Sequence, residues 1–131
     1  MPVTYEIDIP AALIVTRCIG DVTLADVLEH FRELRRVWPP VDRLDVVLDL
    51  RGLTSQPSPK ELVEVTKEID AEIGRHRFGR CAVVANQEPM RESMYEFEGL
   101  VYRFFDGGLQ VFRTPEGALM WLGRSPTPDG L

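Results

Sequence analysis

The residues best placed for chemistry follow a short apolar segment near the middle of the chain. Apolar residues alternate over 44–50, and Asp49 lies near the end of this segment. An arginine and three hydroxyl side chains follow it: Arg51, Thr54, Ser55 and Ser58. Arg and hydroxyl donors beside a helix N-terminus bind anions such as phosphate, and a Ser or Thr there is also a substrate for phosphorylation. These five residues are a candidate anion-binding or switch loop.

Each of these residues also has a structural explanation. Ser58 is followed by Pro59 and Glu61, which matches a helix N-terminus with a capping box, and a cap is worth ~1 kcal/mol without any switch. A phosphate on Ser58 would still suit the positive end of the helix. Arg51 either meets an anion or pairs with Asp49 at the surface, which is worth ~0–1 kcal/mol. A phosphorylated fraction in protein taken from its host would favour the switch.

Further polar residues are expected at the same edge of the molecule. In open α/β sheets, ligands collect outside the carboxyl ends of the parallel strands, where the following helices begin. Three predicted helix N-termini open onto this edge with unpaired N–H groups. The other polar residues expected there are Asp21, Asn86, Gln87, Arg113 and Thr114.

A second candidate site is apolar. Met90, Met94, Phe97 and Val101 recur at helical spacing, which is typical of a core-facing stripe. Met and aromatic side chains at this spacing also line adaptable apolar pockets. Gly99 costs ~1 kcal/mol relative to Ala in a helix and indicates close packing or close approach of a ligand. These five residues are therefore core or the wall of a pocket between helix and sheet.

The remaining reactive side chains do not form a catalytic or metal-binding set. His30 and His76 have no Cys or acidic partner at ligand spacing, and Cys18 and Cys81 lie in apolar segments, where Cys behaves as a small hydrophobe. The basic run 75–80 fits a helix C-terminus. We expect no metal, no cofactor and no enzyme activity.

The elements that position these residues follow from periodicity. Alternation predicts strands over 3–9, 12–19, 44–50, 80–85 and 109–113. Helical spacing and capping signals predict helices after Thr23, Ser58, Pro89 and Thr114. The first two strands form a hairpin, and helical connections require parallel neighbours. The prediction is one α/β domain over 1–123, with a five-stranded, mostly parallel sheet, an antiparallel N-terminal edge strand and four helices. Residues 124–131, with two Pro, are expected to form a flexible tail.

Composition limits the partners. The chain has 131 residues and a formal net charge of −6 at pH 7, which argues against nucleic acid and against an anionic membrane surface. No apolar run approaches the ~20 residues of a membrane helix, and the N-terminus lacks a signal-peptide pattern. We expect a cytoplasmic protein without a transmembrane segment.

Three segments carry a family resemblance. The chain reads Val-Val-Leu-Asp-Leu-Arg-Gly over 46–52 before Pro-Lys-Glu-Leu over 59–62, Cys-Ala-Val-Val-Ala over 81–85, and Val-Phe-Arg-Thr-Pro-Glu-Gly-Ala-Leu-Met-Trp-Leu over 111–122. In order and position they resemble the STAS domains of bacterial anti-sigma-factor antagonists. The resemblance is stronger to bacterial STAS-like relatives with the same fold, which are tied distantly to CRAL-TRIO lipid-binding domains.

The resemblance implies a regulatory role but not its switch. STAS antagonists carry a phosphorylated Ser or Thr in an Asp-Ser-Ser/Thr-Gly motif after this strand. This chain reads Leu-Thr-Ser-Gln-Pro-Ser over 53–58, without the Asp or the Gly. The expected function is a non-enzymatic, STAS-like regulatory or protein-interaction domain with a protein partner or as a homodimer. Right-handed crossovers in simple strand order would leave one sheet face or edge free for such a partner. The alternative is a small binding protein for an apolar or acyl, lipid-like ligand.

Overall fold

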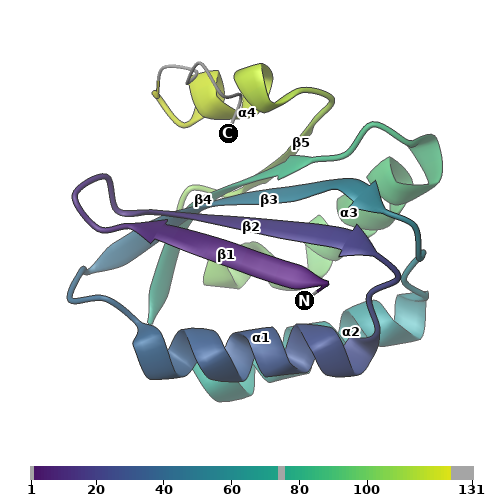
Figure 1. Ribbon diagram of the computed structural model, residues 1–131, viewed down its shortest axis with the longest axis horizontal. Helices are drawn as coiled ribbons and strands as arrows, with labels where there is room; N and C mark the ends of the chain where they lie inside the picture. The colour runs from purple at the N-terminus through teal and green to yellow at the C-terminus, as the bar shows by residue number, and fades with distance from the viewer. Residues whose placement is uncertain (1, 74–75, 125–131) are drawn as a thin grey trace.

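The five strands form one sheet in sequential order (Figure 1). The computed structural model describes residues 2–73 and 76–124. β1 pairs antiparallel with β2, and the β2–β3, β3–β4 and β4–β5 pairs are parallel. This confirms the predicted α/β sheet with an antiparallel N-terminal edge strand. The strands are β1 Val3–Asp8, β2 Leu13–Gly20, β3 Arg43–Leu53, β4 Arg77–Val84 and β5 Leu109–Phe112.

Four helices cover the two faces of the sheet unequally. They are α1 Leu24–Val37, α2 Pro59–Ile73, α3 Glu88–Val101 and α4 Pro115–Trp121, with a 3₁₀ turn, η1, over Tyr102–Phe104. α1, α2 and α3 connect parallel strands and lie on one face, whereas α4 lies on the other (Figure 1). Crossovers of one hand in sequential strand order place their helices on the same face. The rule applies to helices that connect two parallel strands, and α4 follows the last strand. α4 is therefore free to lie on the second face, part of which it covers.

The predicted helix starts are present as hydrogen-bonded caps. Thr23 Oγ1 accepts from the backbone N–H of Asp26 at 3.2 Å, and the Asp26 carboxylate accepts from the N–H of Thr23 at 2.9 Å. Ser58 and Glu61 make the same reciprocal pair at 3.1 and 3.0 Å. Each pair is a capping box, which satisfies two N–H groups that have no partner within the helix.

Some predicted boundaries were wrong. β4 begins at Arg77 rather than Arg80, because Arg77 already pairs with Arg43 of β3. β3 continues to Leu53 rather than ending at residue 50, because Ile19 and Gly20 of β2 pair with Gly52 and Leu53. Arg51 is therefore a strand residue. The predicted cap Gly74 and the tail residues 125–131 lie outside the described part of the chain.

Arg124, the first residue of the predicted tail, is held in place. Its guanidinium donates to the carbonyl oxygen of Ala11 at 2.8 Å and to the Asp45 carboxylate at 3.2 Å. The ordered domain therefore extends at least one residue beyond the predicted boundary.

The sheet separates two apolar cores. The smaller core lies under α4, and the larger one lies between the sheet and the layer of α1, α2 and α3. The larger core is incompletely filled under α1. Leu34 is the buried residue of this helix, whereas Leu24, Val27 and Phe31 are only partly buried. Leu48, in the centre of the middle strand, is also partly exposed.

Candidate functional site

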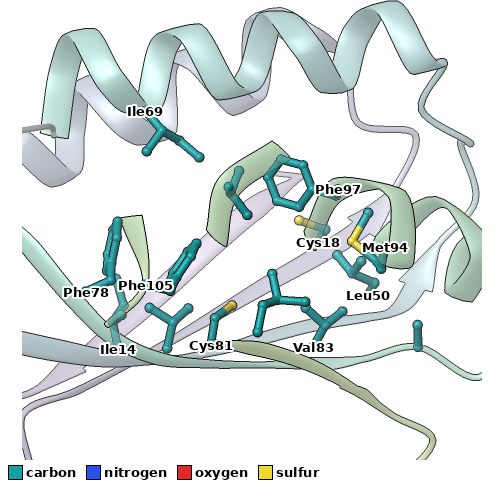
Figure 2. Packing of buried hydrophobic residues seen from close by; sticks show 14 of the residues in the cluster. Ile14, Cys18, Leu50, Ile69, Phe78, Cys81, Val83, Met94, Phe97 and Phe105 are labelled. Atoms are coloured by element: carbon teal, nitrogen blue, oxygen red, sulfur yellow. The ribbon is translucent and has the colours of Figure 1, made fainter. Parts of the chain in front are cut away.

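A cavity of about 540 Å³ explains this incomplete burial. Its floor is the sheet face that carries Ile14, Val46 and Cys81, which the strand register places side by side. Its roof is formed by α1, α2 and α3. In Figure 2, Cys18, Leu50 and Cys81 on the sheet point toward the helical layer that carries Ile69, Met94 and Phe97. Further apolar residues of its wall include Val3, Val22, Leu24, Val27, Phe31, Leu34, Leu48, Leu53, Leu62, Val65, Phe78, Met90 and Phe105.

The floor of the cavity includes several short side chains. Among them are Thr16, Cys18, Val46 and Cys81. The helices cover the sheet as one layer, in which α1 contacts α2 and α2 contacts α3.

The cavity opens at the carboxyl edge of β2 and β3. Its lining residues that are exposed to solvent are Asp21, Thr23 and Gln56, and all three lie in the connections that follow these strands. This is the edge at which ligands bind open α/β sheets. The interior wall is apolar apart from a few groups, among them the buried Thr16 hydroxyl and the His30 ring.

His30 is an uncharged polar group in this wall. Its ring lies 5.4 Å from the ring of Tyr5 and 5.7 Å from that of Phe31. Burial lowers the pKa of His30 to about 4, although the Glu33 carboxylate acts in the opposite direction. The imidazole is therefore neutral at pH 7 and offers one donor and one acceptor.

The two cysteines in the wall are protonated thiols. Burial, with the Asp49 charge as a second cause, raises the pKa of Cys18 to about 11, and burial raises the pKa of Cys81 above its ordinary value. Both are free and buried. Because the thiolate is the nucleophilic form, these residues act as apolar lining at neutral pH.

The hydroxyl groups of the predicted switch loop hold the rim of the cavity together. Thr54 Oγ1 donates to Asp21 at 2.7 Å. Ser55 Oγ accepts from the N–H of Val22 at 3.0 Å and donates to the carbonyl of Val22 at 3.1 Å. Ser58 caps α2. The loop is thus bonded to the connection between β2 and α1.

Asp49 and Arg51 do not belong to this rim. They alternate with Leu48 and Leu50 along β3, so their side chains lie on the face that carries α4. Arg51 binds the buried Asp49 carboxylate through two nitrogens at 2.9 and 2.8 Å. Burial acts to raise the pKa of Asp49, but the hydrogen bonds from Arg51 outweigh it and hold that pKa below its usual value. The five predicted residues therefore occupy two separate places.

A small polar crevice of about 170 Å³ adjoins the opening. Leu50, Leu53, Ser55, Gln56 and Met90 line both spaces. The crevice adds Thr54, Pro89 and the amide side chains of Asn86 and Gln87. Two other residues expected at this edge have structural partners, since Arg113 pairs with Glu88 and Thr114 caps α4.

Three of the five predicted pocket residues line the cavity. Met90, Met94 and Phe97 are in its wall, whereas Val101 is fully buried in the core outside the lining. Gly99 is exposed, and a Cβ added to it would meet nothing within 4 Å. The close packing inferred from Gly99 was therefore wrong. The lining from β2, β3, α1 and α2 was not predicted, because no local pattern reports the spacing between helices and sheet.

Comparison with known proteins adds no family. No protein-family model matches the sequence, and no curated protein matches it significantly. Within residues 2–73 and 76–124, no three His, Cys, Asp or Glu side chains are grouped to hold a metal ion. Among the helices of this described part, none is long and apolar enough to cross a bilayer.

Proposed function

We propose that this chain is a non-enzymatic, cytoplasmic binding protein for an apolar or acyl, lipid-like ligand. The observation that carries the proposal is the apolar cavity of about 540 Å³. Ligand pockets typically have ~300–1,000 Å³ and apolar walls with a few polar groups. Protein interiors are otherwise close-packed, with few voids larger than a water molecule.

The composition of the wall supports an acyl chain as the ligand. Unbranched Met90 and Met94 adapt to ligands of different shape. The aromatic rings of Phe31, Phe78 and Phe97 add large apolar surfaces. Each methylene moved from water into such a wall contributes ~0.8 kcal/mol, so affinity should rise with chain length until the cavity is filled.

Two measurements test this proposal directly. Native mass spectrometry of protein from its own host should show a retained small molecule, and the delipidated protein should bind a neutral apolar dye, N-phenyl-1-naphthylamine. Val65→Trp places a large ring in the cavity and should weaken dye binding by more than tenfold. Val63→Trp is the matched control, because Val63 lies on the same helix, outside the lining and 40% exposed. Equal dye binding by the two variants would exclude the cavity as the binding site.

A second candidate function is the STAS-like regulatory or protein-interaction domain, as a homodimer or with a protein partner. It is favoured by the edge strand β1, whose pairing in the sheet is with β2 alone, because free edges pair readily with another chain. Ile19, 56% exposed, adds an apolar side chain on β2. Light scattering after size exclusion at micromolar concentration tests this candidate. A monomer with no partner recovered from lysate, and with no phosphate on Thr54, Ser55 or Ser58 in host protein, would count against it.

A further inference from the structure

The opening of the cavity carries negative charge. Asp21 and Glu61 line it, and none of the described lining residues is Lys or Arg. His30 is the basic group in the wall, and burial lowers its pKa to about 4, so it is uncharged at pH 7. A carboxylate or phosphate headgroup would meet two like charges there and no cation, which is unfavourable.

The helix N-termini at the opening are partly compensated. In α1 the Asp26 carboxylate, and in α2 the Glu61 carboxylate, binds the backbone N–H of the capping residue, while the capping hydroxyl binds the N–H of that acid. The negative charges of these acids also compensate the positive ends of the two helix dipoles. An external anion would find these N–H groups occupied and a negative charge beside them.

The acids at the opening also have partners within the protein. Asp21 accepts from Thr54 Oγ1 at 2.7 Å, and Glu61 accepts from the N–H of Ser58 at 3.0 Å. A carboxylate has two oxygens and accepts several hydrogen bonds, so each acid can still accept a further bond. The arrangement therefore disfavours an anionic headgroup.

The adjoining crevice offers uncharged hydrogen-bonding groups. The amide side chains of Asn86 and Gln87 and the hydroxyl of Thr54 line it. Amides and hydroxyls both donate and accept hydrogen bonds without a net charge. Since the crevice shares five lining residues with the cavity, one molecule can occupy both spaces.

We infer that the bound molecule is an uncharged amphiphile, with its apolar chain in the cavity and a hydroxyl, ester or amide head in the polar crevice. This inference rests on the proposed function, because it specifies the ligand class of the same cavity. Asp21 and Glu61 select against an anionic head, and the polar side chains around Asn86 bind the uncharged head.

Three amphiphiles with the same acyl or alkyl length test the inference: monolauroylglycerol, laurate and dodecylamine. Each is titrated below its aggregation concentration against the protein loaded with N-phenyl-1-naphthylamine, at pH 7.5 and low ionic strength. Monolauroylglycerol should displace the dye with an affinity roughly tenfold higher than laurate, because the two carboxylates repel laurate. High salt should narrow the gap to laurate, because it screens the like charges.

Charge variants show whether the carboxylates cause the selection. Glu61→Gln removes a charge and retains the cap, since Gln also completes a capping box. It should raise the affinity for laurate several-fold and leave that for monolauroylglycerol unchanged. Glu64→Gln, on the same helix and outside the lining, is the control and should change neither. Asn86→Ala should weaken monolauroylglycerol several-fold without affecting the dye.

The outcomes separate this inference from the proposed function. Equal or tighter binding of laurate or dodecylamine would overturn the uncharged headgroup and leave the binding function standing. Laurate affinity that does not respond to Glu61→Gln would overturn the assigned cause of selection. Failure of the dye and of all three amphiphiles would overturn both proposals.

Discussion

Burial in the wall of the cavity changes the protonation of His30. An imidazole in water is half-protonated near pH 6.5, whereas burial beside Tyr5 and Phe31 lowers the pKa of His30 to about 4. Between these values the unfolded chain binds a proton that the folded protein does not bind. The folded state should therefore lose stability as the pH falls through this window.

The pH dependence can be measured directly on His30→Phe. The wild type should lose up to about 3 kcal/mol of unfolding free energy between pH 6.5 and 4 through this group, less if water in the cavity reaches the ring. His30→Phe retains an aromatic ring and should lack this part of the slope in urea unfolding. His76→Phe, at a ring that stacks on Trp38, serves as the control. Equal slopes in wild type and His30→Phe would contradict the assignment.

Asp49 and Arg51 support the sheet on the face opposite the cavity. Asp49 is 6% exposed and receives two bonds from the Arg51 side chain. Arg51→Leu should lower the unfolding free energy at pH 7 by about 1–3 kcal/mol, because it removes both side-chain donors from a buried carboxylate and leaves only the backbone N–H of residue 51. The same variant should leave dye binding unchanged. The control Arg36→Leu removes an exposed pair with Glu33 and should have little effect on the unfolding free energy. A change in dye affinity for Arg51→Leu would contradict the separation of the two faces of the sheet.

At the scale of elements, the N-terminus of α2 contributes both to the stability of the fold and to the candidate site. Ser58 and Glu61 form its capping box, and Glu61 also lines the opening of the cavity. The loop before it is bonded to Asp21 and Val22. One end of one helix therefore holds the rim in shape and places a negative charge on it.

Ser58 variants test the structural role of this cap. Ser58→Ala should cost about 1 kcal/mol of unfolding free energy, whereas Ser58→Asp should be close to wild type because Asp is an equally good cap. Thr66→Ala, within the same helix, should cost nothing, since Thr is a weaker helix former than Ala and its hydroxyl bonds back to the Leu62 carbonyl. A stable Ser58→Ala variant would show that the cap contributes little, and phosphorylation would then become the stronger explanation of Ser58.

At the scale of the whole molecule, the cavity links ligand binding to folding. The helical layer contacts the sheet only in part beneath α1. The acyl chain of a bound ligand would therefore supply packing contacts that the protein itself lacks. A ligand that binds only the folded state stabilises it by mass action. Occupancy should therefore be visible in thermal unfolding.

Monolauroylglycerol at about one hundred times its dissociation constant should add about 2.7 kcal/mol of stability, which raises the unfolding temperature by roughly 10 °C for a chain of this size. Differential scanning calorimetry with and without the amphiphile measures the change. Val65→Trp should show no comparable increase, while Val63→Trp should follow the wild type. An increase of the same size in Val65→Trp would indicate binding elsewhere.

The sequence by itself determined the features that depend on near neighbours in the chain. The capping boxes at Thr23 and Ser58, the alternating faces of the strands and the order of the elements were all predicted, because each signal lies within a few residues of its effect. The stripe of Met90, Met94 and Phe97 could be assigned to an inward face. Whether it met a filled core or a pocket stayed open, since periodicity gives direction and not distance.

Only the tertiary structure decided where these faces leave room and which distant residues meet. The cavity lies between sheet residues such as Thr16 and Cys81 and the layer of helices. Its size depends on side-chain volumes from several elements at once. The tertiary structure also brought Asp21 to Thr54 and Val22 to Ser55. These contacts join residues far apart in sequence, so no local pattern could have predicted them.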